Sequence, residues 1–130
     1  MKYEEKVSIT YIQTKGKLPR LPFVQMKEAI LGKNYDLSIA CVSPLISKKL
    51  NNTYRGKNKP TNILSFPLSK KDGELVLDLA LIKKEAPKFE RSYRRFVGFL
   101  LIHGMLHLKG MQHGSTMEGK ERKFLKKFEL

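Results

Sequence analysis

The spacing of apolar and polar residues changes along the chain, and it predicts four β-strands. Residues 7–12 alternate apolar and polar side chains and are rich in β-branched residues, which is typical of a half-buried strand. Further strands are expected over 35–42, 62–68 (ending at Pro67) and 74–79. Because Asp72-Gly73 is a strong turn signal between the last two strands, we expect those two to form a hairpin.

Apolar residues at helical spacing predict about five helices. Four of them are expected over 23–31, 43–52, 79–86 and 116–130. The fifth, over 90–109, begins with charged residues and is then apolar on nearly every side. A helix of this kind is buried, so we expect it to run through the core. Residues 53–61 are predicted to form a loop because they contain a glycine and a proline.

The order of these elements indicates an α+β protein with a mixed four-stranded sheet and helices packed on it. At 130 residues, of which 41% are hydrophobic, the chain is expected to form one domain over 1–130. No apolar run is long enough to cross a bilayer, and residues 1–6 lack the apolar core of a signal peptide. We therefore expect a cytoplasmic protein. The single Cys41 excludes an intrachain disulfide and fits a buried position.

All three histidines of the chain fall between positions 103 and 113. His103 and His107 are four residues apart, so a helix places both imidazoles on one face. Gly110 is suited to the left-handed conformation that ends a helix and turns the chain, which would bring His113 back to the same point. Three imidazoles around one point are the ligand set of an open zinc site, whose fourth position is left for water.

Other interpretations of this pattern stay open. A single histidine on an apolar helix is usually a buried core residue without a ligand, although three in this arrangement favour a metal. Neutral imidazole also suits copper, iron and nickel; we expect one zinc ion per chain because zinc is redox-inert and tetrahedral. A zinc protease helix carries a glutamate directly after its first histidine as general base. Gly104 stands there instead, which indicates the close approach of another element or of a substrate.

The charge of the chain points to a polyanionic partner. There are 26 Lys and Arg against 12 Asp and Glu, a net charge of +14. A field of this sign favours nucleic acid, although a generally basic surface without one partner gives the same count. Arg55, Lys57 and Lys59 gather in the predicted loop, where cations can hold phosphate oxygens. Taken singly, Lys57 and Lys59 fit a solvated turn better.

Two blocks of the sequence carry a family resemblance. The first runs from His103 to His113 and reads His-Gly-Met-Leu-His-Leu-Lys-Gly-Met-Gln-His. The second spans residues 50–67 and contains Tyr-Arg-Gly-Lys-Asn-Lys-Pro-Thr-Asn-Ile-Leu-Ser-Phe-Pro. They resemble, in order and spacing, the His-Gly-x-Leu-His-Leu-x-Gly-Tyr-Asp-His and Tyr-Arg-x-Lys-Asp-Lys-Pro-Thr-Asp-Val-Leu-Ser-Phe-Pro patterns of the YbeY family. That family consists of bacterial metal-dependent endoribonucleases that mature ribosomal RNA. The resemblance covers roughly residues 43–129.

The resemblance implies a single-strand-specific endoribonuclease that processes the 3′ end of small-subunit ribosomal RNA and acts in ribosome quality control. It implies that His103, His107 and His113 bind the metal and are catalytic together with Arg55, whose family counterpart is considered important at the substrate cleft. The implied partner is ribosomal RNA in the small ribosomal subunit, with no DNA and no membrane. The implied fold is α+β and similar to zinc proteases in placing a histidine helix beneath a sheet edge.

The sequence departs from the family pattern at three carboxylates, which are amides here: Asn58, Asn62 and Gln112. A carboxylate beside a metal-binding imidazole orients the ring and raises its basicity. We therefore expect either weaker metal retention or a substitute carboxylate such as Glu118 or Glu121. The departures keep a second function open, a ribosome-associated RNA-binding assembly factor with a structural metal and little catalysis. A third, a metallopeptidase-like hydrolase, lacks its base at Gly104.

Overall fold

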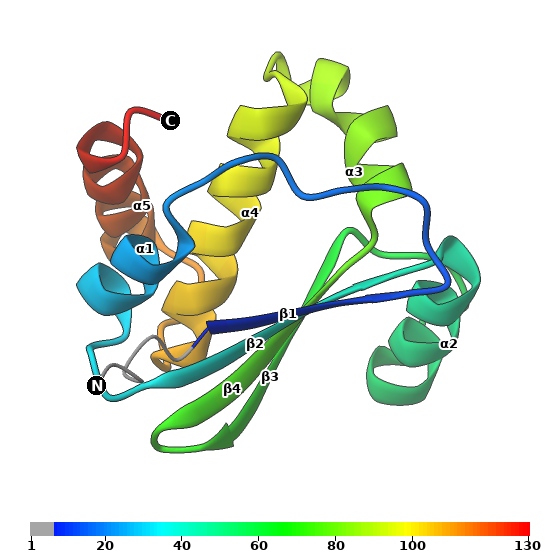
Figure 1. The fold of residues 1–130 in the computed structure, drawn as a ribbon, viewed down its shortest axis with the longest axis horizontal. Helices are drawn as coiled ribbons and strands as arrows, with labels where there is room; N and C mark the ends of the chain where they lie inside the picture. The colour runs from blue at the N-terminus through cyan, green and yellow to red at the C-terminus, as the bar shows by residue number, and fades with distance from the viewer. Residues whose placement is uncertain (1–6) are drawn as a thin grey trace.

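The computed structural model describes residues 7–130 and contains one four-stranded sheet in the order β1-β2-β4-β3 (Figure 1). The strands β1 (Val7–Ile12), β2 (Asp36–Val42) and β4 (Asp72–Leu77) are parallel neighbours. The strand β3 (Ile63–Ser69) pairs antiparallel with β4 and forms one edge of the sheet. The mixed sheet and the hairpin predicted from the sequence are therefore confirmed.

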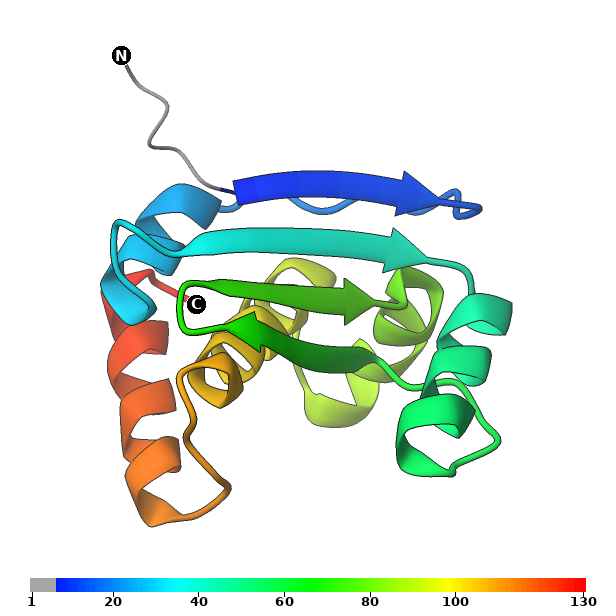
Figure 2. The same cartoon turned by 90° about the horizontal axis from the view of Figure 1, so that it is seen from below.

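The helices of the described residues cover both faces of this sheet. They are α1 (Phe23–Ile30), α2 (Pro44–Arg55), α3 (Leu79–Glu85), α4 (Tyr93–Leu108) and α5 (Ser115–Lys127), with a short 3₁₀ helix, η1 (Ala86–Phe89), before α4. Figures 1 and 2 show α4 crossing one face, with α1 and α5 on one side of it and α3 on the other. The α+β class and the number of helices agree with the prediction.

Alternation along the strands divides the apolar side chains between two clusters. On β2, Ile39 and Cys41 belong to the main core, which also contains side chains of α1, α3, η1, α4 and α5. Ala40 and Val42 belong to the smaller cluster under α2. This follows from the two-residue period of a strand. The helix α4 is buried along most of its length, as its apolar sequence predicts. Burial also raises the pKa of the Cys41 thiol to about 11.

Several predicted boundaries are wrong: α5 ends at Lys127 rather than 130, and three other elements differ for a clear local reason. The helix α2 continues to Arg55, because Gly56 adopts a left-handed conformation (φ 70°) and ends the helix there. The strand β4 ends at Leu77 rather than 79, because the Asp78 carboxylate caps α3 by accepting from the backbone N–H of Leu81. It begins at Asp72 rather than 74, since the turn of the hairpin is at 70–71 and the predicted turn residues Asp72-Gly73 already lie in the strand. The helix α4 begins at Tyr93 rather than 90, since Ser92 is its N-cap.

The edge position of β3 explains a further difference. The strand continues through Pro67 to Ser69, with a register shift between these two residues, whereas the sequence placed its end at the proline. Proline lacks a backbone N–H and is therefore tolerated at an edge or a bulge. Residues 1–6, on which the expectation of no signal peptide depends, lie outside the described part of the chain. Within 7–130, no helix has both the length and the apolar composition needed to cross a bilayer.

Candidate metal site and its cavity

The end of α4 brings the three histidines together. Gly110 has a φ of 100°, its N–H donates to the carbonyl of His107 at 2.9 Å, and the N–H of Met111 donates to the carbonyl of Leu106 at 3.0 Å. These paired bonds form the motif in which a left-handed residue reverses the chain after a helix. His113 consequently returns toward the helix, and ligand atoms of the three imidazoles lie within 4.8 Å of one another. The convergence expected from the spacing is confirmed.

The outer ring nitrogens define which atoms are free to bind a metal. The Nδ1 of His103 faces the carboxylate of Glu121, and the Nδ1 of His107 lies 3.0 Å from the carbonyl oxygen of Met111. Since an ionised carboxylate and a carbonyl oxygen can only accept, each Nδ1 carries the proton. In the neutral form that binds a metal, both rings would therefore present the lone pairs of their Nε2 atoms toward each other.

The separation of these nitrogens fits a metal. The Nε2 atoms of His103 and His107 are 3.1 Å apart. Two lone pairs at this distance need a cation between them, either a proton or a metal ion. In a tetrahedral zinc site with Zn–N bonds of about 2.0–2.1 Å, two ligand nitrogens lie about 3.3 Å apart. The three-histidine donor set and its spacing thus fit zinc, with His113 as the third ligand.

The surroundings of His107 favour the neutral form of its imidazole, which is the form that binds a metal. Burial lowers the pKa of His107, and the nearby His103 lowers it further, against opposing contributions from the Met111 carbonyl and from Glu121. A metal ligand must be neutral imidazole, so a lowered pKa extends the range in which His107 can bind. His103 and His107 are half-buried, whereas His113 is exposed, which leaves one side of the cluster open.

Glu121 is the carboxylate that supports the site. It lies on α5, is only 8% exposed, and contacts the Nδ1 of His103. Of the two glutamates that the sequence suggested as substitutes, the structure brings Glu121 to the histidines and leaves Glu118 exposed. Gln112, which replaces the family aspartate, is also exposed. The orienting carboxylate therefore comes from a different helix.

Arg55 shares a cavity with the three histidines. This cavity has a volume of about 290 Å³ and is also lined by Thr61, Asn62 and the side chains of three phenylalanines, Phe89, Phe96 and Phe99. Arg55 reaches it from the last turn of α2, not from the loop in which the sequence placed it. Lys57 and Lys59 do not line the cavity and are exposed, in agreement with a solvated turn. Sequence reasoning missed the three phenylalanines, for which it offered no signal beyond their apolar character.

Asn62 shows why an amide suits its position. Its Nδ2 donates to the Glu85 carboxylate at 3.0 Å. An aspartate would place a second negative charge against Glu85, whereas the amide supplies a hydrogen bond. Asn58 is exposed and does not line the cavity. Of the departures from the family pattern at 58 and 62, only Asn62 therefore lines the histidine cavity.

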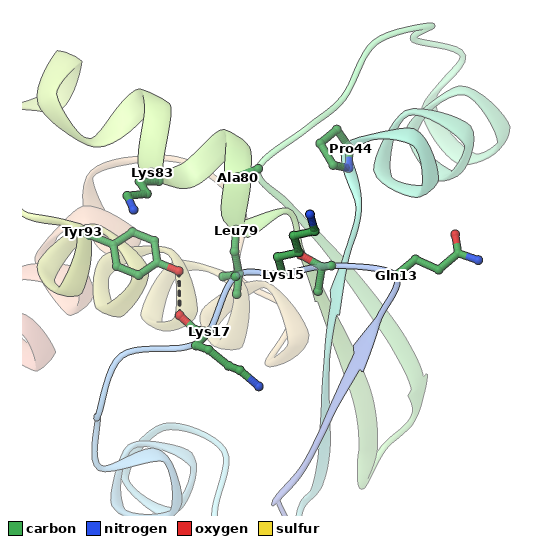
Figure 3. Close-up of a pocket in the computed structure, with 10 residues that line it drawn as sticks. Gln13, Lys15, Lys17, Pro44, Leu79, Ala80, Lys83 and Tyr93 are labelled. Carbon is green, nitrogen blue, oxygen red and sulfur yellow. Dashed lines mark hydrogen bonds between the residues drawn. The ribbon is translucent and has the colours of Figure 1, made fainter.

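A larger cavity lies elsewhere and has a different character. It has a volume of about 610 Å³ and lies where the loop 13–17 passes the start of α3 (Figure 3). The Tyr93 hydroxyl holds this loop by donating to the carbonyl of Lys17 at 2.9 Å. Lys15, Lys17 and Lys83 line the cavity, and its lining includes no histidine, cysteine or carboxylate. The described residues therefore place the metal-binding chemistry only in the smaller cavity.

Comparison with known proteins agrees with this geometry. The family model described as Endoribonuclease YbeY matches residues 3–129. The chain belongs to the YbeY family. Curated YbeY endoribonucleases are similar to it: the protein of Persephonella marina is 39% identical over 88 residues, which are 62% of this chain and 58% of that protein. The Alkaliphilus metalliredigens protein is 33% identical over 99 residues, 68% of this chain and 64% of its own length.

The match with YbeY relatives is partial in length. The alignments span less than two thirds of the Persephonella and Alkaliphilus proteins. The relative from Caldicellulosiruptor saccharolyticus is 32% identical, and its alignment covers 75% of this chain and 70% of that protein. The solution structure of TM1509 from Thermotoga maritima superposes with a TM-score of 0.59, covering 92% of this chain and 88% of that one at 23% identity. That likeness confirms the fold.

Proposed function

We propose that this protein is a metal-dependent endoribonuclease that cleaves single-stranded RNA. The observation that carries the proposal is the shared cavity, in which three convergent imidazoles and an arginine meet. The names of its YbeY relatives and the net charge of +14 support RNA as the substrate class. We further propose that the substrate is the 3′ region of small-subunit ribosomal RNA, that the protein acts there in ribosome quality control, and that it works in the cytoplasm.

Each residue of the cavity has a definite part in this reaction. His103, His107 and His113 would hold one zinc ion, which supplies a Lewis acid and lowers the pKa of a bound water. Glu121 holds His103 in the tautomer that presents its Nε2, and the Met111 carbonyl does the same for His107. The guanidinium of Arg55 would bind a phosphate oxygen and offset the negative charge that grows during displacement.

A second function is favoured by what the cavity lacks. No carboxylate lines it in the described residues, and Glu121 is already engaged with His103, so no general base is at hand. This favours an RNA-binding assembly factor of the small ribosomal subunit with a structural metal. The metallopeptidase alternative has no such support, because Gly104 is packed against the sheet and leaves no base beside His103.

Metal content separates a metal protein from a metal-free one. The metal content of untagged wild type and untagged His107→Ala is measured by elemental analysis. The proteins are untagged because a tag would add histidines that bind metal. We expect about one zinc per chain in the wild type and its loss in the variant, because two ligands do not retain the ion. A well-folded wild type without metal would contradict the metal-dependent mechanism and leave the binding factor.

Cleavage of single-stranded RNA then separates the enzyme from the binding factor. We expect His113→Ala to abolish cleavage while the circular dichroism spectrum and melting temperature stay near wild type, because His113 is exposed and outside the core. Arg55→Ala should lower the cleavage rate by about 100-fold, the usual cost of losing one donor to transition-state charge. Wild-type activity in His113→Ala would remove the histidine cluster from the mechanism.

A further inference from the structure

A row of aromatic rings leads from the protein surface to the candidate metal site. Phe89 stacks on Phe96 with ring centroids 5.0 Å apart and planes inclined by 22°. Phe96 and Phe99 follow at 6.5 Å and 6°, and the ring of Phe99 lies 5.8 Å from that of His103. Phe96 is buried at 1% exposure, whereas Phe89 at the outer end of the row is 55% exposed.

The position of Phe89 distinguishes it from other exposed apolar residues. Single apolar side chains on a protein surface are ordinary. Among the large ones exposed within 7–130, however, only Phe89 lines the histidine cavity. Leu45 and Leu68 are equally exposed but lie away from it. Phe89 is therefore a largely exposed aromatic residue in the same cavity as the three histidines and Arg55.

The backbone holds this ring in place. Phe89 ends η1, and Glu90 adopts a left-handed conformation directly after it. The N–H of Glu90 donates to the Pro87 carbonyl at 3.0 Å, and the N–H of Arg91 donates to the Ala86 carbonyl at 3.1 Å. Both hydrogen bonds span Phe89 and close the turn around it. The ring itself stacks on Phe96. A ring ordered in advance loses little conformational entropy when a ligand stacks on it.

Cations lie beside the aromatic row. The guanidinium of Arg91 sits 4.1 Å from the centroid of Phe99, and Arg55 lines the same cavity. Aromatic rings that stack with bases, next to cations that hold phosphates, are the combination by which proteins bind single-stranded nucleic acid. We propose that Phe89 is a stacking surface for one unpaired nucleobase of an RNA strand bound in the histidine cavity. This inference rests on the proposed function. Phe89 would select single-stranded RNA, since a paired base is already stacked in its own helix.

Fluorescence tests the contact directly. The chain contains no tryptophan, so Phe89→Trp introduces a single reporter at the ring. A single-stranded oligoribonucleotide of mixed sequence is titrated into the full chain, first as purified and then after removal of metal by a chelator. The second titration excludes a contribution from metal-dependent cleavage. We expect the emission of the variant to be quenched as RNA binds. Leu45→Trp, at a position 61% exposed on α2, is the matched control and should keep its emission. Equal responses in the two variants would overturn the proposal.

Affinity measures the contribution of the ring. Phe89→Ala should weaken RNA binding by about 5- to 150-fold, the range found for loss of one base-stacking aromatic. Phe89→Tyr keeps the ring and should bind within about twofold of wild type, which keeps the test decisive where the alanine variant is unstable. Leu45→Ala is the control for loss of an exposed apolar side chain. Affinities that are alike in Phe89→Ala and Leu45→Ala would exclude a stacking role.

A double-mutant cycle identifies the base. Oligoribonucleotides that lack one base at successive positions are bound to the wild type and to Phe89→Ala. At one position, removal of the base should weaken wild-type binding and leave the variant unaffected, because both changes delete the same contact. Additive losses at every position would show that Phe89 stacks on no particular base.

These binding measurements do not depend on catalysis. If the wild type fails to cleave RNA but shows the Phe89-dependent binding, the endoribonuclease proposal fails and the stacking surface stands. If it cleaves RNA while Phe89→Ala binds like the wild type, the stacking surface fails and the endoribonuclease proposal stands.

Discussion

Glu121 and His103 belong to different helices, and their contact decides how the candidate metal site is supported. The carboxylate is nearly buried at 8% exposure, and a buried charge is costly unless a partner offsets it. The Nδ1–H of His103 provides that partner, and the bond orients the ring so that Nε2 points to the other histidines. The carboxylate that orients His103 is therefore supplied by Glu121 on α5.

This contact leads to a prediction for metal affinity. Glu121→Gln should weaken metal binding by about 10- to 100-fold, the usual cost of removing a group that orients a ligand. The amide keeps the size of the side chain but loses the negative charge that orients the His103 ring through its Nδ1–H. Glu118→Gln, one turn earlier and exposed on the same helix, is the control and should leave affinity unchanged. Competition with a chromogenic chelator measures both, and equal affinities in the two variants would show that Glu121 has no supporting role.

At the level of the element, Gly104 fixes how closely α4 lies on the sheet. A Cβ atom built at this position would come within 2.7 Å of Leu75 Cδ2 and 2.8 Å of Ile63 Cδ1. The Ser65 hydroxyl also donates to the Gly104 carbonyl at 3.4 Å. The sequence left open whether the glycine admits another element or a substrate, and the structure shows that it admits β3 and β4. Since His103 precedes Gly104, this packing also determines how the histidines lie relative to the cavity.

Two glycine substitutions test this packing. Gly104→Ala should lower the free energy of unfolding by about 1–3 kcal/mol, because overpacking at the contact with the sheet outweighs the better helix propensity of alanine. Gly119→Ala on α5 is the matched control, since its Cβ would meet only Arg122 Nη2 at 3.9 Å. It should raise stability by about 0.5–1 kcal/mol. Urea denaturation compares them, and stabilisation by both substitutions would mean that α4 does not need the glycine.

For the molecule as a whole, the charge of +14 predicts that the proposed RNA binding depends on salt. Single-stranded nucleic acid releases counterions as its phosphates are neutralised, so the logarithm of affinity should fall linearly with the logarithm of salt concentration. Arg55→Ala should reduce the steepness of this line by about 0.7, the value of one phosphate contact. Phe89→Ala should lower affinity with the steepness unchanged, because stacking releases no counterions. Fluorescence anisotropy at several salt concentrations measures both, and an unchanged slope in Arg55→Ala would show that Arg55 binds no phosphate.

Much of the fold was predictable because its signals are local. Alternation identified β1, although its side chains are mostly exposed rather than half-buried. The turn signal predicted the hairpin, although the turn itself is at 70–71 and Asp72-Gly73 begins β4. The apolar run of 96–106 predicted the buried α4. The errors at Arg55, Asp78 and Tyr93 are at element ends, where a single capping residue decides whether the element continues. Such ends depend on single hydrogen bonds, such as that from Leu81 N–H to Asp78, which apolar periodicity does not report.

Part of the candidate metal site was likewise predictable from local sequence, and part was not. The sequence by itself determined the histidine cluster, because a helix places His103 above His107 and a glycine two residues past the helix turns the chain toward His113. The family resemblance implied Arg55 at the substrate cleft, but the spacing of residues gave no such link, and the fold places Arg55 in the histidine cavity. Only the tertiary structure selected Glu121 over Glu118 and placed Phe89 at the rim. These residues are separated from the histidines by many positions along the chain. Their meeting depends on how α2, α5 and η1 pack around α4, which no short-range spacing specifies.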